Sequence, residues 1–173
     1  MPDVVFQIKD NEGTAVHDAK VLAAYPDGRY LTGHTDADGN CRLDLYRTDQ
    51  EMKVLVASED HLPFHTTIDP EISRVVPLQL RSSKDDRKAL LFTQSTGFIP
   101  GISGRLNPHK DGYVYGDNLA INGRLATPAA RFKIGDALHL IDVYGVETDI
   151  RFLVVEGQFS LLEYTEPKAY AGE

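Results

Sequence analysis

The stretch Thr35-Asp36-Ala37-Asp38-Gly39-Asn40, followed directly by Cys41-Arg42-Leu43-Asp44-Leu45, decides how this chain folds. Its first part is rich in turn chemistry, because aspartate side chains bond to nearby backbone amides and glycine adopts the positive φ of tight turns. Its second part alternates apolar and polar residues, which is typical of a strand with one buried face. The stretch therefore predicts a hairpin turn that leads into a half-buried β-strand.

The same alternation recurs throughout the N-terminal half of the chain. Turn residues separate the alternating runs, and the Asp-Gly pairs at Asp27-Gly28 and Asp38-Gly39 predict two hairpins. Six or seven short strands, each with one apolar face, need a second sheet to cover that face. The N-terminal half is therefore expected to be a small β-sandwich. The expected strands are centred on residues 4–8, 21–25, 41–45, 54–56, 64–68 and 76–80.

A composition shift at Arg81 to Lys88, a segment without an apolar residue, marks the expected domain boundary. We expect one domain at residues 1–81, a linker at 82–88 and a second domain at 89–173. A basic docking site is the alternative interpretation of the linker. The second domain again shows short alternating segments, which predict a small β-barrel or a second sandwich. The whole chain is thus expected to be all-β.

The N-terminal half resembles the carboxypeptidase regulatory-like domain family over about residues 3 to 80. The resemblance rests on Gly13-Thr14-Ala15-Val16, on Thr35 to Asn40 before the next strand, and on Val54 to Ala57 leading into His61-Leu62-Pro63. It implies an Ig-like or transthyretin-like β-sandwich without peptidase chemistry. Related folds are grouped with carbohydrate-binding modules, which implies a binding function by analogy. No binding residue can be carried across, and the C-terminal half resembles no family that we recognise.

The composition bounds the possible partners of this chain. Its 173 residues carry a formal charge of −8, which argues against nucleic acid or an anionic membrane as a partner. Neither a secretory leader at Met1-Pro2-Asp3 nor a membrane-spanning apolar stretch is visible, so the predicted location is the cytoplasm. The single cysteine, Cys41, is expected to be a small buried residue rather than a reactive thiol.

Two residue groups could in principle bind a metal ion. The oxygen donors of Asp36 and Asp38 resemble the start of a calcium loop, but the glycine comes too early and no glutamate follows at the required place. His61 and His65 lie four residues apart, and only a bend at Pro63 would bring them together. We interpret the first group as a turn and the second as surface or turn histidines. No metal and no cofactor is predicted.

The segment from Ser95 to Pro108 combines three glycines and two prolines, which exclude a regular helix or a central strand. Phe98 and Ile102 make it too apolar for a solvated linker. It is either a binding loop or a structural loop that closes the second domain. Ser95 and Ser103 lack the glycine pattern of a nucleophile elbow, so neither predicts a hydrolase.

The strongest candidate for ligand contact is the run Tyr113-Val114-Tyr115-Gly116-Asp117-Asn118. Tyr113 and Tyr115 would share one face of a strand and could stack on sugar rings, while polar side chains nearby would bind hydroxyl groups. A tyrosine pair on a half-buried sheet is the alternative. The predicted ligand-binding residues are Arg105, Asn107, Tyr113, Tyr115, Asp117 and Asn118.

These patterns predict a non-catalytic ligand-binding module rather than an enzyme, with a carbohydrate as the ligand. One alternative is a protein-interaction or assembly adaptor that uses the apolar loop from Phe98 to Leu106 or an exposed sheet edge. Another is a hydrolase with its site between the two domains.

Overall fold

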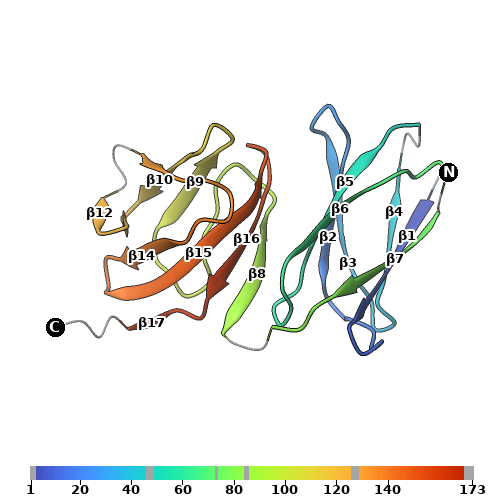
Figure 1. Ribbon diagram of the computed structural model, residues 1–173, viewed down its shortest axis with the longest axis horizontal. Coiled ribbons are helices and arrows are strands. Elements are labelled where there is room, and N and C mark those ends of the chain that lie inside the picture. The colour runs from blue at the N-terminus through green and yellow to red at the C-terminus, as the bar shows by residue number, and fades with distance from the viewer. Residues whose placement is uncertain (1–2, 46–48, 73, 84–85, 126–128, 170–173) are drawn as a thin grey trace. The chain divides into compact units, whose positions relative to one another are not determined.

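The computed structural model describes residues 3–45, 49–72, 74–83, 86–125 and 129–169. These residues form strands, turns and bends without any helix, so the predicted all-β fold is confirmed. None of them therefore belongs to a helix that could cross a membrane. The chain divides into two compact units, unit 1 at Met1–Lys84 and unit 2 at Asp85–Glu173. Figure 1 shows their strands from β1 to β17.

Unit 1 is a sandwich of two sheets with the orders β4-β1-β7 and β3-β2-β5-β6. β1 pairs antiparallel with β4 and parallel with β7, whereas all pairs in the other sheet are antiparallel. The strands are β1 (Asp3–Asp10), β2 (Lys20–Ala24), β3 (Tyr30–His34), β4 (Asn40–Asp44), β5 (Met52–Ala57), β6 (Phe64–Ile68) and β7 (Val75–Leu80).

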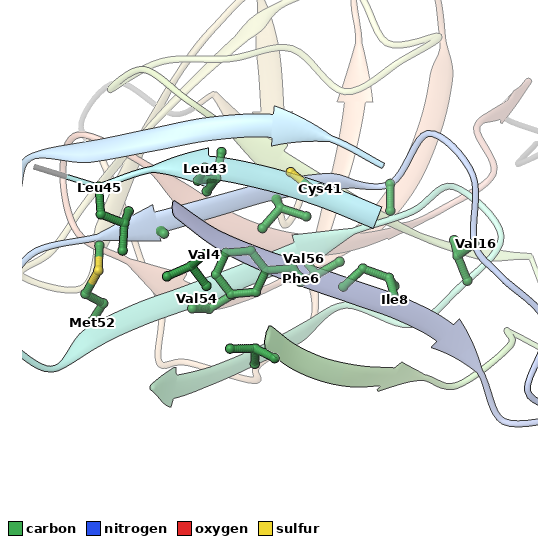
Figure 2. Close-up of a cluster of buried hydrophobic side chains, with 14 of the residues drawn as sticks. Val4, Phe6, Ile8, Val16, Cys41, Leu43, Leu45, Met52, Val54 and Val56 are labelled. Atoms are coloured by element: carbon green, nitrogen blue, oxygen red, sulfur yellow. The ribbon is translucent and has the colours of Figure 1, made fainter. Parts of the chain in front are cut away.

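The core of unit 1 consists of the alternate side chains that both sheets direct inward (Figure 2). Phe6 on β1, Cys41 on β4 and Val54 on β5 are all buried there. Fully burying a side chain as large as Phe6 contributes about 1.5–3 kcal/mol. Burial also raises the pKa of the Cys41 thiol to about 11, which suits a core residue and not a nucleophile.

The two Asp-Gly turns of unit 1 have different roles. Asp27-Gly28 joins β2 to its antiparallel neighbour β3, so the hairpin predicted there is confirmed. The hairpin predicted at Asp38-Gly39 is wrong, because β3 and β4 belong to different sheets. At Asp38-Gly39 the chain crosses from one layer of the sandwich to the other.

Hydrogen bonds around Thr35 explain this crossing. The buried Thr35 hydroxyl donates to the Val16 carbonyl at 2.6 Å and accepts from the Ala19 amide at 2.8 Å. The Asp36 carboxylate then accepts the amides of Asp38 and Asn40 at 2.9 and 3.0 Å, which confirms the interpretation of this segment as an aspartate turn. The chain is thereby held against the β1–β2 connection instead of folding back on β3.

Unit 2 contains two sheets that share one core. The small sheet has the order β13-β10-β9, and the large sheet has the order β12-β11-β14-β15-β16-β8, with β17 paired to β15. β8 begins at Arg87, inside the segment expected to be a linker. The strands are β8 (Arg87–Phe92), β9 (Arg105–His109), β10 (Tyr113–Asp117), β11 (Leu119–Ile121), β12 (Arg124–Leu125), β13 (Ala130–Arg131), β14 (Leu138–Asp142), β15 (Val146–Val155), β16 (Ser160–Thr165) and β17 (Lys168–Ala169).

The glycine-rich segment before β9 closes the core of unit 2. Gly97 and Leu106 bond to each other through both backbone groups, and Ile99 and Ile102 between them are buried in the core. The Ser103 amide donates to Asp142 at 2.8 Å, which fixes the loop to the end of β14. This segment has the packing of a structural loop, and only Phe98 among its large apolar side chains is exposed.

Asp142 holds two parts of unit 2 together. Its Oδ2 accepts the Ser103 amide, while its Oδ1 accepts the amides of Tyr144 and Val146, both at 2.9 Å. Burial alone would raise the pKa of the Asp142 carboxyl, but these hydrogen bonds outweigh burial and lower the pKa from its ordinary value. The ionised form is thus the one that the fold stabilises.

Replacing Gly39 by alanine should destabilise unit 1 more than replacing Gly13. Both glycines have φ near +80°, which costs an L-residue about 1–2 kcal/mol. A Cβ on Gly39 would also lie 2.5 Å from the Ile8 carbonyl oxygen, whereas a Cβ on Gly13 meets nothing within 4 Å. We expect Gly39→Ala to lower the free energy of unfolding by about 1–3 kcal/mol more than Gly13→Ala, measured by urea denaturation. Equal losses would contradict the crossing geometry.

Replacing Asp142 by asparagine should remove a pH-dependent part of the stability of unit 2. Because its pKa is lowered by folding, the carboxylate stabilises the fold above its unfolded pKa, and this contribution is lost as pH falls through the folded pKa. One amide oxygen cannot accept hydrogen bonds on both sides, so Asp142→Asn should cost about 2 kcal/mol at pH 7.

The measurement is urea unfolding of the wild type, Asp142→Asn and the exposed control Asp111→Asn between pH 7 and pH 2. The gap between the wild type and Asp142→Asn should narrow toward pH 2, while Asp111→Asn stays close to the wild type throughout. A gap of constant size would show that the charge of Asp142 does not matter.

Candidate functional site

The β9–β10 hairpin presents one polar and aromatic surface. Leu106 and Val114 point into the core of unit 2, so the residues that alternate with them point outward. The register places cross-strand neighbours on that outward side, and Arg131 on β13 lies opposite Tyr113. We call this surface the β9–β10 face and define it by Arg105, Asn107, His109, Tyr113, Tyr115, Asp117 and Arg131.

Five of the six residues predicted to bind a ligand lie together on the β9–β10 face. Arg105 pairs with Asp117, and Asn107 pairs with Tyr115, with Tyr113 next along β10. The sixth, Asn118, follows the end of β10 in a left-handed conformation with φ of 61° and lies outside the face. The alternation of β9 and β10 is thus what gathers the predicted residues.

Three aromatic rings form the centre of the face. His109 and Tyr113 stack with centroids 4.6 Å apart and an angle of 17° between the rings. Tyr115 packs at a steep angle to both, at 5.3 Å from His109 and 5.6 Å from Tyr113. Tyr115 is 40% exposed, so it offers the most open ring surface of the three. The edge-to-face contacts with His109 and Tyr113 restrict the rotation of the Tyr115 ring.

Charge is unevenly distributed over the face. Arg105 donates to Asp117 at 2.7 Å, and this exposed pair is close to neutral. Arg131 is exposed and has no ion-pair partner among the residues that the structure describes. Its guanidinium group is therefore the positive charge that the face can offer to an anion.

His109 and Arg131 belong to the face but were not predicted. His109 continues the alternation of Arg105 and Asn107, but Pro108 beside it argued against a strand. The structure accommodates Pro108 because β9 is an edge strand, where a missing amide is tolerated. Arg131 lies far from the hairpin in sequence, and only the pairing of β13 with β10 brings it to the face.

A second cluster in unit 2 surrounds His139 on β14. Its Nδ1 lies 2.8 Å from Asp149 and its Nε2 lies 3.5 Å from Glu147. Both ring nitrogens thus face carboxylates of the neighbouring strand. Nδ1 is hydrogen-bonded to Asp149, and Nε2 faces Glu147, whose buried Oε2 has no hydrogen-bond partner among the described residues, so neither nitrogen is directed at an open ligand position.

The residue groups considered for metal binding serve local structure. The Asp36 carboxylate is engaged by the amides of its own turn, and His61 bonds to the Ser58 hydroxyl at 3.0 Å. His65 points to the exposed side of β6. In the described ranges, no three His, Cys, Asp or Glu side chains come together in a way that could hold a metal ion.

Unit 1 has a groove beside its edge strand β7. It has a volume of about 670 Å³ and is lined mainly by Leu62, Pro63, Phe64 and Leu78, with Arg81 as its cationic residue. Only one aromatic ring contributes to it. The β9–β10 face combines three rings with an unpaired guanidinium and is the better candidate for ligand contact.

Comparison with known proteins shows that this chain is similar in sequence to an enzyme. No protein-family model matches the chain, so the resemblance of its N-terminal half to the carboxypeptidase regulatory-like family stays a prediction. The chain is 26% identical over 166 residues to the 3' cyclic ADP-D-ribose synthase AaTIR of Aquimarina amphilecti. That alignment covers 92% of this chain and 49% of the synthase, so the chain spans about half the length of its relative.

This similarity overturns the function expected from the sequence. The predictions of a non-catalytic module, whether carbohydrate-binding or an adaptor, and of no enzymatic role are wrong, because the relative is a synthase. The alternative of a hydrolase stays a prediction that this similarity does not test. The error has a physical cause. Aromatic rings, an amide and a guanidinium on one strand face suit a sugar and a nucleotide equally well, and the chemical class of the ligand cannot be read from those residue types alone.

Replacing His109 by phenylalanine should preserve the fold and raise its stability slightly. The Nε2 of His109 is buried and has no hydrogen-bond partner within the described ranges, and an unsatisfied buried polar atom is costly. Phenylalanine keeps the stack on Tyr113 and removes that atom, so we expect the free energy of unfolding to rise by about 1 kcal/mol.

The matched control is His139→Phe, which removes a ring whose Nδ1 is hydrogen-bonded to Asp149 at 2.8 Å and should lower stability. Thermal or urea unfolding of both variants measures the effect. A clear loss of stability in His109→Phe would show that Nε2 makes an interaction that the fold needs.

Proposed function

We propose that this chain works in an enzyme that produces a cyclic ADP-ribose type of nucleotide. The observation that carries the proposal is the alignment with the Aquimarina synthase, which covers 92% of this chain and therefore includes both units. The alignment thus extends over most of the chain and is not confined to a single motif.

The β9–β10 face supports this proposal. An ADP-ribose nucleotide has a flat base and a diphosphate with two negative charges. The face offers an exposed ring, Tyr115, and an uncompensated guanidinium, Arg131, which suit those two parts. Because the whole chain has a net charge of −8 and repels anions, a local positive charge is needed to attract one.

Cyclisation also requires the donor to be held in a folded shape, and a binding surface can provide this. The ADP-ribosyl donor must bring its anomeric carbon close to another position of the same molecule before water reacts with that carbon. Fixing the base and the diphosphate on a rigid sheet reduces the number of shapes that the donor can adopt. We assign the binding of the base and the diphosphate to the β9–β10 face.

The test is conversion of an ADP-ribosyl donor by the purified protein, at the full length in which it occurs naturally. Nicotinamide adenine dinucleotide is a suitable donor, because loss of nicotinamide and a proton leaves an ADP-ribose that closes on itself. We expect liquid chromatography with mass spectrometry to show free nicotinamide and a product one water lighter than ADP-ribose. Heat-denatured protein is the control. Absence of nicotinamide release, or release of open ADP-ribose alone, would overturn the proposal.

A further inference from the structure

We infer that the groove beside β7 in unit 1 binds an alkanoate, a carboxylate with an unbranched apolar chain, and that Arg81 pairs with the carboxylate. The groove has a volume of about 670 Å³, within the range of about 300–1,000 Å³ that small-molecule sites have. All the residues that line it belong to unit 1. The site is therefore independent of the β9–β10 face and of the proposed function.

The groove lies where the core of unit 1 is incompletely covered. β6 is the last strand of one sheet and β7 is the last strand of the other. Phe64 on β6 and Leu78 on β7 pack against the core but are only partly buried. Both side chains line the groove, so a ligand there removes further apolar surface of the core from water.

The segment before β6 supplies more of the apolar lining. The Leu62 amide donates to the Arg81 carbonyl at 2.8 Å, which fixes this segment beside the end of β7. Leu62 and Pro63 line the groove together with Pro77. The lining is thus mainly aliphatic, which suits an alkyl chain, and each methylene group that leaves water adds to the affinity.

Arg81 is the one charged residue that lines the groove in the described part of the chain. It is exposed, and its guanidinium has no ion-pair partner among the described residues. Asp10 lies opposite Leu80 in the register, but its carboxylate accepts two backbone amides of its own turn. Asn11 and Gln79 complete the lining with neutral amides. A carboxylate can therefore form two parallel N–H bonds with Arg81 without meeting a negative charge in the lining.

The balance of charge and apolar surface selects this ligand class. One guanidinium matches the single charge of a carboxylate, whereas a phosphate with two charges needs more donors than the groove offers. A peptide would bring backbone amides and carbonyls that need partners. Pro77 in the edge strand has no amide to donate, so the groove is poorly suited to pair with a peptide backbone.

Hexanoate, octanoate and decanoate are the probes, titrated into the protein by calorimetry below the concentrations at which they form micelles. Each step along this series adds two methylene groups, so we expect each step to tighten binding by about ten-fold. Octanamide has the octanoate chain without the charge and should bind about ten-fold more weakly than octanoate. NMR of the backbone amides should show shifts at Leu62, Leu78 and Arg81.

Two substitutions separate the charge from the apolar contact. Arg81→Gln should weaken octanoate by about ten-fold and leave octanamide unchanged. Leu62→Ser should weaken both by about five-fold, because both carry the alkyl chain. Leu62 lies outside the core cluster of unit 1, so this variant is expected to fold.

The matched controls lie in the segment that leads into β7. Arg74→Gln removes an exposed arginine, and Ile72→Ser removes an apolar side chain that is 82% exposed. Neither residue lines the groove, so both variants should bind every probe like the wild type. Urea unfolding of all four variants checks that the fold is intact.

The site would be overturned by an affinity that does not change with chain length, by equal binding of octanoate to the wild type and Arg81→Gln, or by equal losses in the controls. Absence of decanoate binding at low millimolar concentration would overturn it as well. Acetyl-trileucine with a free carboxyl group probes the end of a peptide. If it binds more tightly than decanoate, the assignment to an alkanoate is wrong and the groove is a peptide site.

Discussion

The buried hydroxyl group of Thr35 marks the point where the chain leaves one sheet of unit 1 and enters the other. It bonds to Val16 and Ala19, on the connection that precedes β2, and so holds the crossing segment against a fixed part of the fold. The next strand, β4, is thereby delivered to β1 in the register that places Cys41 opposite Phe6. Because a shift of one residue would turn every inward side chain outward, the core of unit 1 depends on this crossing.

The same turn chemistry builds both units. Asp10, Asp36 and Asp142 are each followed three residues later by glycine, and each carboxylate accepts the amides of the second and fourth residues after it. Hydrogen bonds of this kind favour the ionised carboxyl, and the pKa values of Asp10 and Asp142 are lowered accordingly. Asp142 uses its second oxygen for Ser103, far away in sequence, so a local turn also becomes a tertiary link.

The sequence predicts strands and turns, which depend on neighbouring residues, but it does not predict which strands pair with each other. In unit 1, alternation identifies six of the seven strands and their inward faces but misses β3, and the Asp-Gly pair at Asp27-Gly28 correctly predicts a hairpin. The pair at Asp38-Gly39 has the same local chemistry but joins two sheets, because Thr35 and the β1–β2 connection decide the direction of the chain. The same holds for the candidate site. Five predicted residues share a face because of alternation along β9 and β10, whereas Arg131 lies on that face only because β13 pairs with β10.

The chemical class of the ligand is a further step removed from the sequence. Rings and amides on a strand face bind any flat or hydroxylated molecule, so Tyr113, Tyr115 and Asn107 are compatible with several ligand classes. The ligand classes differ in charge, so the unpaired charges of the β9–β10 face distinguish between them. The positive charge of Arg105 is paired with Asp117, whereas Arg131 has no ion-pair partner among the described residues. This difference follows from the strand register and cannot be predicted from the amino-acid composition. In a chain with net charge −8, one guanidinium without an ion-pair partner beside three packed rings is the feature on which the proposed contact with an aromatic anion rests.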